Sequence, residues 1–524
     1  MADLVTLSAP SAVALRPHPV YSALLPTWQK LAHAAEGTSG FADGTYLVAH
    51  PREWLDHAAD SPTKPTKKLL ERRKLARYEG WPDTILTLLA GALFRTPPTR
   101  RVGDEEVTEA HPLAAWWDDV DGLGTPMDAY MAQSWLAAAV FGHVFLVMDR
   151  PTTPAQTAAE AGRLYLRRYT PLDVPDWLVD EAGELTAVRL FEAVPRDTFD
   201  GQNSTQIREV TAEGWRVLER TGDGRVATKP LSEGQHDYAG ALPVVVLYAK
   251  RRPLTPIVGQ SVLGDPNIYQ DDYNLSSEIR ELLRKQTFSM LNVPLGTGPD
   301  AVQVAEAQAM LGETMGTANV AFTPEPASFI SADPANVEVY QAERQEVRRT
   351  MFRLAGLPWE GDSRAAESGD SRRIKREDLN QTLARYADEV QTAERTLAQL
   401  WFRAEYGDRW TQELEAAEVE VSYPNTFDSE VLDDTITRTQ LALTLRLGKT
   451  ATDALKRQLV GKLLPDVPPS QMSAIEAEIA AMRDPEEERA ERLAGMAQAF
   501  RAGGREVGED RDEDVVDREA VDAQ

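Results

Sequence analysis

The sequence predicts an α+β protein that is mainly helical, and three observations carry this prediction. Segments within residues 163–250 alternate polar residues with β-branched or aromatic ones, as half-buried strands do. Three long segments with apolar residues at helical spacing follow: 265–288, 333–358 and 374–407. Residues 429–482 then return to helical spacing, with prolines as breaks. We therefore expect a lobe that contains a sheet, then long helices, then a helical C-terminal part.

The composition limits the classes of function. The chain has 524 residues, 42% of them hydrophobic, which is enough to form sizeable cores. Fifty-six basic and 83 acidic residues give a formal net charge of −27, which disfavours tight binding to nucleic acid or to anionic lipid. The absence of cysteine excludes disulfides, cysteine nucleophiles and thiolate metal sites. The N-terminus lacks a secretory signal pattern and no apolar stretch is long enough to span a membrane, so we expect no membrane partner.

The N-terminal elements can be placed in order. Residues 63–95 predict two helices that are broken at Trp81. The first carries the basic run 67–74, for which a solvated face is the simpler interpretation and phosphate contact the alternative. Residues 125–151 predict a helix that stops at Gly142 and continues as a buried strand.

Two irregular segments separate the long helices. The first, 289–335, is bounded by Gly and Pro and predicts a short helix and two short strands: 302–311, 320–323 and 327–330. The second, 359–373, is a polar loop without apolar periodicity, and a plain linker is one interpretation of it. Its one large aromatic residue, Trp359, is expected to pack at a helix end. The last residues, 484–524, are acidic and polar and predict a disordered tail.

The sequence contains no complete catalytic or metal-binding motif. Gly448-Lys449-Thr450 looks like the end of a phosphate loop, but the glycine that this motif needs five residues earlier is Leu443. Glu53 and His57 have helical i, i+4 spacing, yet no third ligand accompanies them. We therefore expect no catalytic residue, no cofactor and no metal site.

Several motifs occur in a fixed order over about residues 20–480. They are GTYLVAHPREW at 44–54, AVFGHVFLVMDRP at 139–151, RRYTPLDVPDW at 167–177, NIYQDDYNLSSEIRELLRKQTFSMLNVPLGTG at 267–298, and LTLRLGKTATDALKRQL at 443–459. Their order and spacing resemble those of the portal (head–tail connector) proteins of tailed bacteriophages.

The resemblance implies a portal-like subunit with a β-containing wing, a two-helix stem, a small mixed clip and a helical crown. It divides the chain into a wing lobe, a first stem helix, a clip, a second stem helix, a tunnel loop, a long helix that returns to the wing, a crown and an acidic tail. The corresponding ranges are 1–264, 265–288, 289–335, 336–358, 359–373, 374–427, 428–483 and 484–524.

The resemblance also implies a function without catalysis. Twelve copies would form a ring at one capsid vertex, through which double-stranded DNA enters during packaging and leaves at ejection. The implied partners are the large terminase subunit, the major capsid and scaffold proteins, and head–tail adaptor proteins. The protein would assemble in the host cytoplasm and reside in the virion. Two alternatives are another head–tail adaptor component of the virion and a metal-dependent phosphate-handling enzyme.

An acidic channel wall repels DNA and lets it slide. A few basic side chains at defined heights would then suffice for transient contact with phosphates. The candidates are Arg280, Arg284 and Lys285 on the first stem helix, and Arg364, Arg372 and Arg373 around the loop. Ion pairing within the protein is the alternative, for example between Glu281 and Lys285, which have i, i+4 spacing.

Overall fold

The fold is known from a computed structural model. It describes residues 12–103, 105–106, 111–150, 163–194, 199, 204–220, 224–287, 290–294, 302–303, 305, 320–323, 328–330, 335–359, 369–425, 427, 455–456, 460, 475 and 477–478. The chain divides into two compact units, Met1–Phe427 and Asp428–Gln524. The described residues of the second unit are all helical. The Gly448 motif and the segment 484–524 lie outside the described residues.

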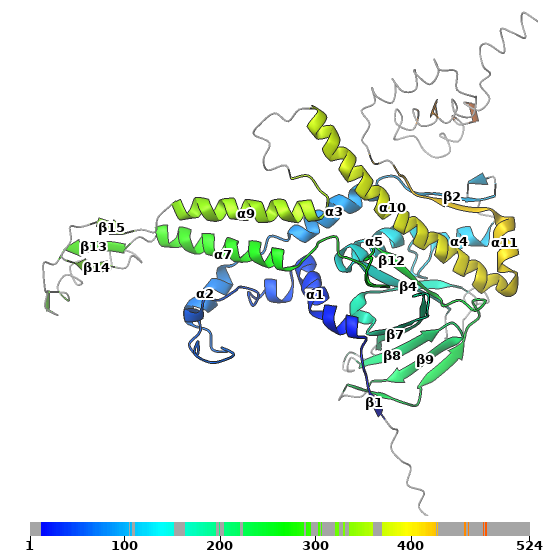
Figure 1. The fold of residues 1–524 in the computed structure, drawn as a ribbon, viewed down its shortest axis with the longest axis horizontal. Coiled ribbons are helices and arrows are strands. Elements are labelled where there is room, and N and C mark those ends of the chain that lie inside the picture. Colours follow the sequence, from blue (N-terminus) through cyan, green and yellow to red (C-terminus); the bar gives the residue numbers. More distant parts are fainter. Residues whose placement is uncertain are drawn as a thin grey trace, which may run out of the picture. The chain divides into compact units, whose positions relative to one another are not determined.

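The core of the first unit lies where helices cover a three-stranded sheet (Figure 1). Helix α5 (Met127–Phe141) ends at Gly142, which has a φ of +98°, and strand β4 (His143–Asp149) follows at once. This confirms the prediction for the segment. All seven residues of β4 are buried, because it pairs on both sides, with β12 (Val244–Tyr248) and β5 (Tyr165–Tyr169).

Helices from distant parts of the sequence pack around this core. Helices α1, α3 and α10 all contact α5. The two helices predicted within 63–95 are confirmed, and Gly80, with a φ of +60°, separates them. The helices of the lobe are α1 (Pro19–Glu36), α2 (Lys67–Leu75), α3 (Trp81–Leu93), α4 (Pro112–Asp118), α10 (Gly369–Tyr406) and α11 (Trp410–Ala417), with single 3₁₀ turns η1 (Ser39–Phe41), η2 (Pro51–Glu53), η3 (Pro171–Asp173) and η6 (Gly407–Arg409).

The predicted β-rich segment forms an antiparallel five-stranded sheet in the order β11-β9-β8-β7-β6. Ala212 and Glu213 form the short turn that joins β8 to β9. Strands β6 (Asp176–Val179), β7 (Leu185–Val194), β8 (Ser204–Thr211), β9 (Gly214–Glu219) and β11 (Ser232–Gln235) form this sheet. Two smaller sheets complete the lobe. In one, β1 (Ala12–Ala14) pairs with β10 (Arg225–Ala227). In the other, β2 (Thr99–Val102) lies between β16 (Val419–Ser422) and β3 (Glu105–Glu106).

Three histidines begin helical turns in the lobe. His18, His50 and His111 each precede a proline, and the Nδ1 atom of each accepts the backbone N–H two residues later, at 3.3, 3.2 and 3.1 Å. Proline suits the first helical position because it has no N–H to satisfy, and the histidine caps the N–H that follows. The His-Pro dipeptide is the sequence signal for these caps.

Two long helices, α7 (Asn267–Thr287) and α9 (Ala335–Leu354), lie side by side (Figure 1). They run antiparallel, since Asp272 near the start of α7 contacts Arg344 at the middle of α9 and Arg348 nearer its end. Both helices were predicted from the sequence, and both predictions are confirmed.

The chain between α7 and α9 contains a three-stranded sheet in the order β14-β13-β15. Strand β13 pairs in parallel with β14 and antiparallel with β15. The predicted strands correspond to β14 (Val320–Thr323) and β15 (Ser328–Ile330), whereas β13 (Met290–Pro294) was not predicted. The three described residues of the predicted short helix, 302, 303 and 305, are helical, and the rest of it lies outside the described residues.

Helix α10 begins at Gly369, five residues before the predicted start at 374. The prediction of a loop over 359–373 is therefore wrong for its last five residues. The Ser-Arg-Arg stretch before Ile374 has no apolar side chain and so no amphipathic signal, but arginine is itself a good helix former.

Candidate functional site

One end of the α7–α9 pair is held by a cluster of buried charges, which we call the Asp272 cluster. Arg344 and Arg348 each donate through Nε to Oδ1 of Asp272, at 2.9 and 3.0 Å. Their Nη2 atoms donate to the two carboxylate oxygens of Glu79, at 2.6 Å each. The Asp272 side chain is only 4% exposed, so the two guanidinium groups are what make its charge tolerable. The Asp272 cluster thus joins α7 and α9 to the segment that leads into α3.

The Asp272 cluster also keeps its arginines charged. Burial alone would lower the pKa of Arg344, but its hydrogen bond to Asp272 and the charges of Asp272 and Glu79 raise that pKa instead. The guanidinium of Arg348 lies 4.8 Å from the centre of the Trp81 ring. Cation–π contact of this kind favours arginine over lysine at the position.

A second set of polar contacts holds α2 against α7. Arg72 donates to Oε2 of Glu53 at 2.8 Å and to Oγ of Ser277 at 3.1 Å, with its side chain 9% exposed. Lys68 lies 3.2 Å from Glu281. The interpretation of this basic run as a solvated face is therefore wrong on the side that meets α7. The partners on α7, Ser277 and Glu281, are about 200 residues away in the sequence, so local spacing could not reveal them.

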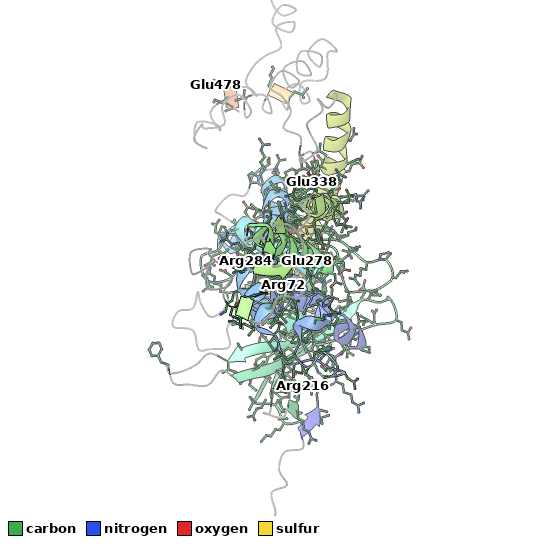
Figure 2. All side chains as sticks on the ribbon, turned by 90° about the vertical axis from the view of Figure 1, so that its left-hand side faces the viewer. Arg72, Arg216, Glu278, Arg284, Glu338 and Glu478 are labelled. Atoms are coloured by element: carbon green, nitrogen blue, oxygen red, sulfur yellow. The ribbon has the colours of Figure 1, made fainter. Side chains whose placement is uncertain are left out.

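Helices α2 and α9 contact opposite sides of α7. At about 100° per residue, Ser277 and Glu281 point about 140° and 180° away from Asp272 around the helix axis. The first two face α2, and Asp272 faces α9. Figure 2 looks along the helix pair and shows the same arrangement, with Glu338 of α9 on one side of α7 and Arg72 of α2 on the other.

The candidate DNA contacts on α7 lie toward the side that meets α2. Arg280 points about 80° away from Asp272, between the sides that meet α9 and α2, and Arg284, at about 120°, lies beside Ser277 at the edge of the α2 side. Arg280 is half-buried and Arg284 is exposed. Lys285 belongs to α7 as well, but its side chain lies outside the described residues. The predicted pairing of Glu281 with Lys285 involves this side chain, and one described partner of Glu281 is Lys68.

The candidates around the loop are placed less completely. Arg364 lies outside the described residues. Arg372 and Arg373 belong to the first turns of α10, not to a loop, and their side chains lie outside the described residues. Trp359 packs against Phe352 at 4.9 Å and Trp81 at 6.0 Å between ring centres, as expected for an aromatic residue at a helix end.

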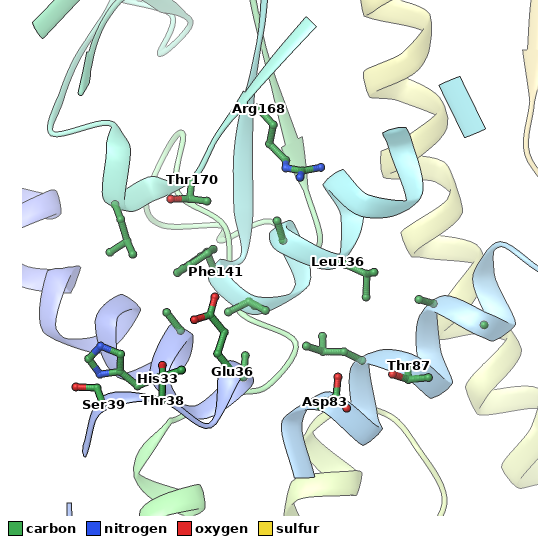
Figure 3. A pocket seen from close by; sticks show the side chains of 18 residues that line it. His33, Glu36, Thr38, Ser39, Asp83, Thr87, Leu136, Phe141, Arg168 and Thr170 are labelled. Carbon is green, nitrogen blue, oxygen red and sulfur yellow. The ribbon is translucent and has the colours of Figure 1, made fainter. Parts of the chain in front are cut away.

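An open pocket of about 960 Å³ lies among α1, α3 and α5. Small side chains form much of its wall: Ala32, Ala35, Ala90, Gly91 and Ala137. Figure 3 shows Glu36, Asp83 and Arg168 well apart around the pocket. His33, at its edge, lies 2.7 Å from the Tyr46 hydroxyl. The described wall therefore offers no paired acid and base for catalysis.

The described part of the chain contains no group of three or more His, Asp or Glu side chains that could hold a metal ion. Glu53 binds Arg72 and accepts the backbone N–H of His50 at 3.0 Å, so its carboxylate is committed away from His57. None of the described helices has the length and apolar character needed to cross a membrane.

Comparison with known proteins gives distant structural matches only. No protein-family profile and no curated protein matches the sequence. A chain from the neck of an empty gene transfer agent particle matches with a TM-score of 0.41 and 14% identity, over 80% of this chain and 99% of that chain. A chain from the virion of the native particle gives 0.36 and 14%, over 77% and 97%. One from the neck of the native particle gives 0.37 and 14%, over 74% and 90%. We base no argument on similarity at this level.

Proposed function

We propose that this chain is the subunit of a portal, a ring at one capsid vertex that conducts DNA into the head during packaging and out at ejection. The observation that carries the proposal is the antiparallel pair α7–α9 with a small sheet inserted between its ends. The pair is fastened to the lobe at one end through the Asp272 cluster. Pairs of this kind from neighbouring copies, set side by side, would form the wall of a channel.

The other elements receive roles from their positions along the chain. The lobe up to residue 264 would be the wing, α7 and α9 the stem, and the sheet β13–β15 the clip. The segment 359–373 would contain the tunnel loop, now shortened by the early start of α10. Residues 428–483 would be the crown. The clip would dock head–tail adaptors and the large terminase subunit, while capsid and scaffold proteins would surround the ring. We propose twelve copies per ring.

The DNA contacts would be few. Arg280 and Arg284 share one side of α7 and are one helical turn apart, so they would meet a phosphate strand at adjacent heights. Lys285, Arg364, Arg372 and Arg373 remain candidates on sequence grounds. Because the chain carries a net charge of −27, most of the wall would repel a DNA duplex, and these basic side chains would hold it only briefly.

Imaging of the purified protein by negative-stain electron microscopy, with light scattering for its mass, tests the proposal. We expect rings with a central hole wide enough for a DNA duplex. A monodisperse monomer, both alone and after co-expression with capsid and scaffold proteins, would overturn the proposal.

The DNA contacts need a separate test. The double variant Arg280→Ala/Arg284→Ala should assemble normally and change the yield of packaged DNA, because only the channel surface is altered. The triple variant Arg364→Ala/Arg372→Ala/Arg373→Ala tests the second group in the same assay. Arg409→Ala, in the lobe, is the control. An unchanged packaging yield in both variants would remove these residues as DNA contacts while leaving the ring intact.

A further inference from the structure

The outer side of α2 carries both positive charge and apolar surface. Leu69 and Arg72 face inward and are covered, whereas Lys67, Leu70, Glu71 and Lys74 are exposed, so the two lysines outweigh one glutamate on this side. Leu70 exposes 45% of its surface. We call this exposed surface, with Leu75 at its end, the α2 face. The open leucine between lysines offers apolar area that a neighbouring molecule with acidic side chains can cover.

The outer side of α9 has the opposite charge. Arg344 and Arg348 face α7, and the exposed residues between positions 338 and 346 are Glu338, Val339, Ala342, Glu343 and Glu346, together with glutamines. Glu346 pairs with Arg349 of the same helix, so Glu338 and Glu343 supply the acidic charge. Val339 exposes 68% of its surface. We call this surface the α9 face. It is acidic and has an open apolar residue in its middle, so it complements the α2 face in both respects.

The two faces also lie at the same level of the helix pair. Arg72 reaches α7 at Ser277, five residues beyond Asp272. Since α9 runs antiparallel to α7 and meets Asp272 at 344 and 348, residues of about 339–343 lie level with Ser277. A copy rotated about an axis along the helix pair would therefore bring an α2 face and an α9 face together at one height.

We propose that the α2 face of one copy packs on the α9 face of the next copy around the ring. This inference rests on the proposed function and names the contact that closes the ring. The faces lie on opposite sides of α7, which is the arrangement that a head-to-tail contact requires. Copies that each carry a charge of −27 repel one another, so a contact between them needs a local match of opposite charges. Leu70 and Val339 supply apolar area to be buried.

Cysteine cross-linking tests the contact directly, because the chain has no cysteine of its own. In the variant Leu70→Cys/Val339→Cys, α7 separates the two positions within one chain, so a disulfide can form only between copies. We expect a ladder of covalent oligomers on a non-reducing gel. The single variants Leu70→Cys and Val339→Cys should stay monomeric alone and form a mixed dimer when combined. Leu123→Cys combined with Val339→Cys is the control, since Leu123 is 88% exposed but belongs to a loop after α4.

The outcomes separate the two proposals. Rings in the microscope without the ladder would overturn this contact and leave the portal proposal standing. A homodimer of Leu70→Cys alone would also overturn it, because like faces would then meet. Absence of both rings and ladder would overturn both proposals.

Reversal of charge provides a second measurement that does not depend on disulfide formation. The variant Lys67→Glu/Lys74→Glu should weaken self-association about tenfold, since two attractive pairs become repulsive. Addition of Glu338→Lys and Glu343→Lys in the same chain should restore it. Unchanged association of the first variant, or no recovery in the combined variant, would contradict the contact.

Discussion

The lobe and the helix pair α7–α9 are held together in different ways. In the lobe, β4 is buried along its whole length and packs under α5, with Trp135 and Phe145 almost fully covered. In the helix pair, Asp272 of α7 binds Arg344 and Arg348 of α9. The stabilisation from burying apolar side chains does not depend on their exact orientation. A buried ion pair, in contrast, is stable only while all of its charged partners are in place.

This difference indicates which part of the molecule is stable without a neighbouring copy. The lobe has a large apolar core within one chain, although some of its leucines, such as Leu70 and Leu123, are exposed. The helix pair leaves charged and apolar side chains open along α9, where Val337, Met351 and Phe352 are the large buried residues among those described. We infer that the lobe is stable in a single copy and that the helix pair gains stability from its neighbours.

The largest expected effect is in the lobe, at Gly259. A Cβ atom there would lie 2.0 Å from the carbonyl oxygen of Gly142. That oxygen cannot move away easily, because it accepts the N–H of Ala249 at 3.0 Å. Gly259→Ala should therefore lower the free energy of unfolding by about 3–5 kcal/mol, measured by urea denaturation.

The control for this substitution is Gly91→Ala, because Gly91 lies in α3 and a Cβ there would meet nothing within 4 Å. Its stability should be unchanged or raised by up to about 1 kcal/mol. If Gly259→Ala unfolds at the same urea concentration as the unaltered protein, close packing of the backbones at Gly142 and Gly259 does not stabilise the lobe.

The next effect should be confined to the helix pair. Asp272→Ala leaves two half-buried guanidinium groups with only the partly exposed carboxylate of Glu79, which costs up to about 3 kcal/mol. Amide hydrogen exchange across α9 should then accelerate roughly a hundredfold, while exchange in β4 stays slow. Asp271→Ala is the matched control, because the neighbouring carboxylate is exposed. Equal acceleration in α9 and β4 would show that the two regions unfold as one.

Local sequence patterns predicted the elements of this fold better than the contacts between them. The helix, glycine and strand around Gly142 were predictable, because the periodicity changes at one residue that tolerates a positive φ. Strand β13 was missed, since Met290–Pro294 ends in proline and is too short to show alternation. The start of α10 was missed because its first turns are polar.

The candidate site was predictable only in part for the same reason. The spacing of Arg280 and Arg284 places them on one side of a helix, and the helix is present. The docking of α2 through Arg72 was not predictable, because Ser277 is far away in the sequence and polar residues carry no signal of burial. The role of Gly259 depends equally on a distant backbone segment.

A smaller effect concerns the one histidine buried in β4. Burial first, and the charge of Arg252 second, lower the pKa of His143 to about 3, whereas an unfolded histidine titrates near 6.5. Neutral, buried His143 therefore contributes fully to the free energy of unfolding above about pH 6.5. As the pH drops toward 3, this contribution falls by about 1.4 kcal/mol per pH unit. His143→Asn retains an acceptor for the N–H of Gly259 but does not titrate.

Urea unfolding at pH 7, 6 and 5 measures this contribution. The unaltered protein should lose stability over this range faster than His143→Asn does. The remaining histidines are common to both proteins and cancel in the difference. Parallel pH profiles would mean that His143 is hydrated or charged in the folded lobe, and the lobe would then be less dry than its apolar packing indicates.

The smallest expected effect tests whether burial, and not charge alone, determines how much an ion pair contributes to stability. Arg409 lies 3.6 Å from Glu413, with its side chain 71% exposed, so Arg409→Ala should change the free energy of unfolding by less than about 0.5 kcal/mol. The lobe also has a buried pair, in which Arg100 binds Glu394, a side chain with 0% exposure. Arg100→Ala should cost several times more in the same assay, because Glu394 would keep a buried charge without its partner. If both substitutions cost the same, burial is not what gives the Asp272 cluster its importance, and the contrast between lobe and helix pair would need another cause.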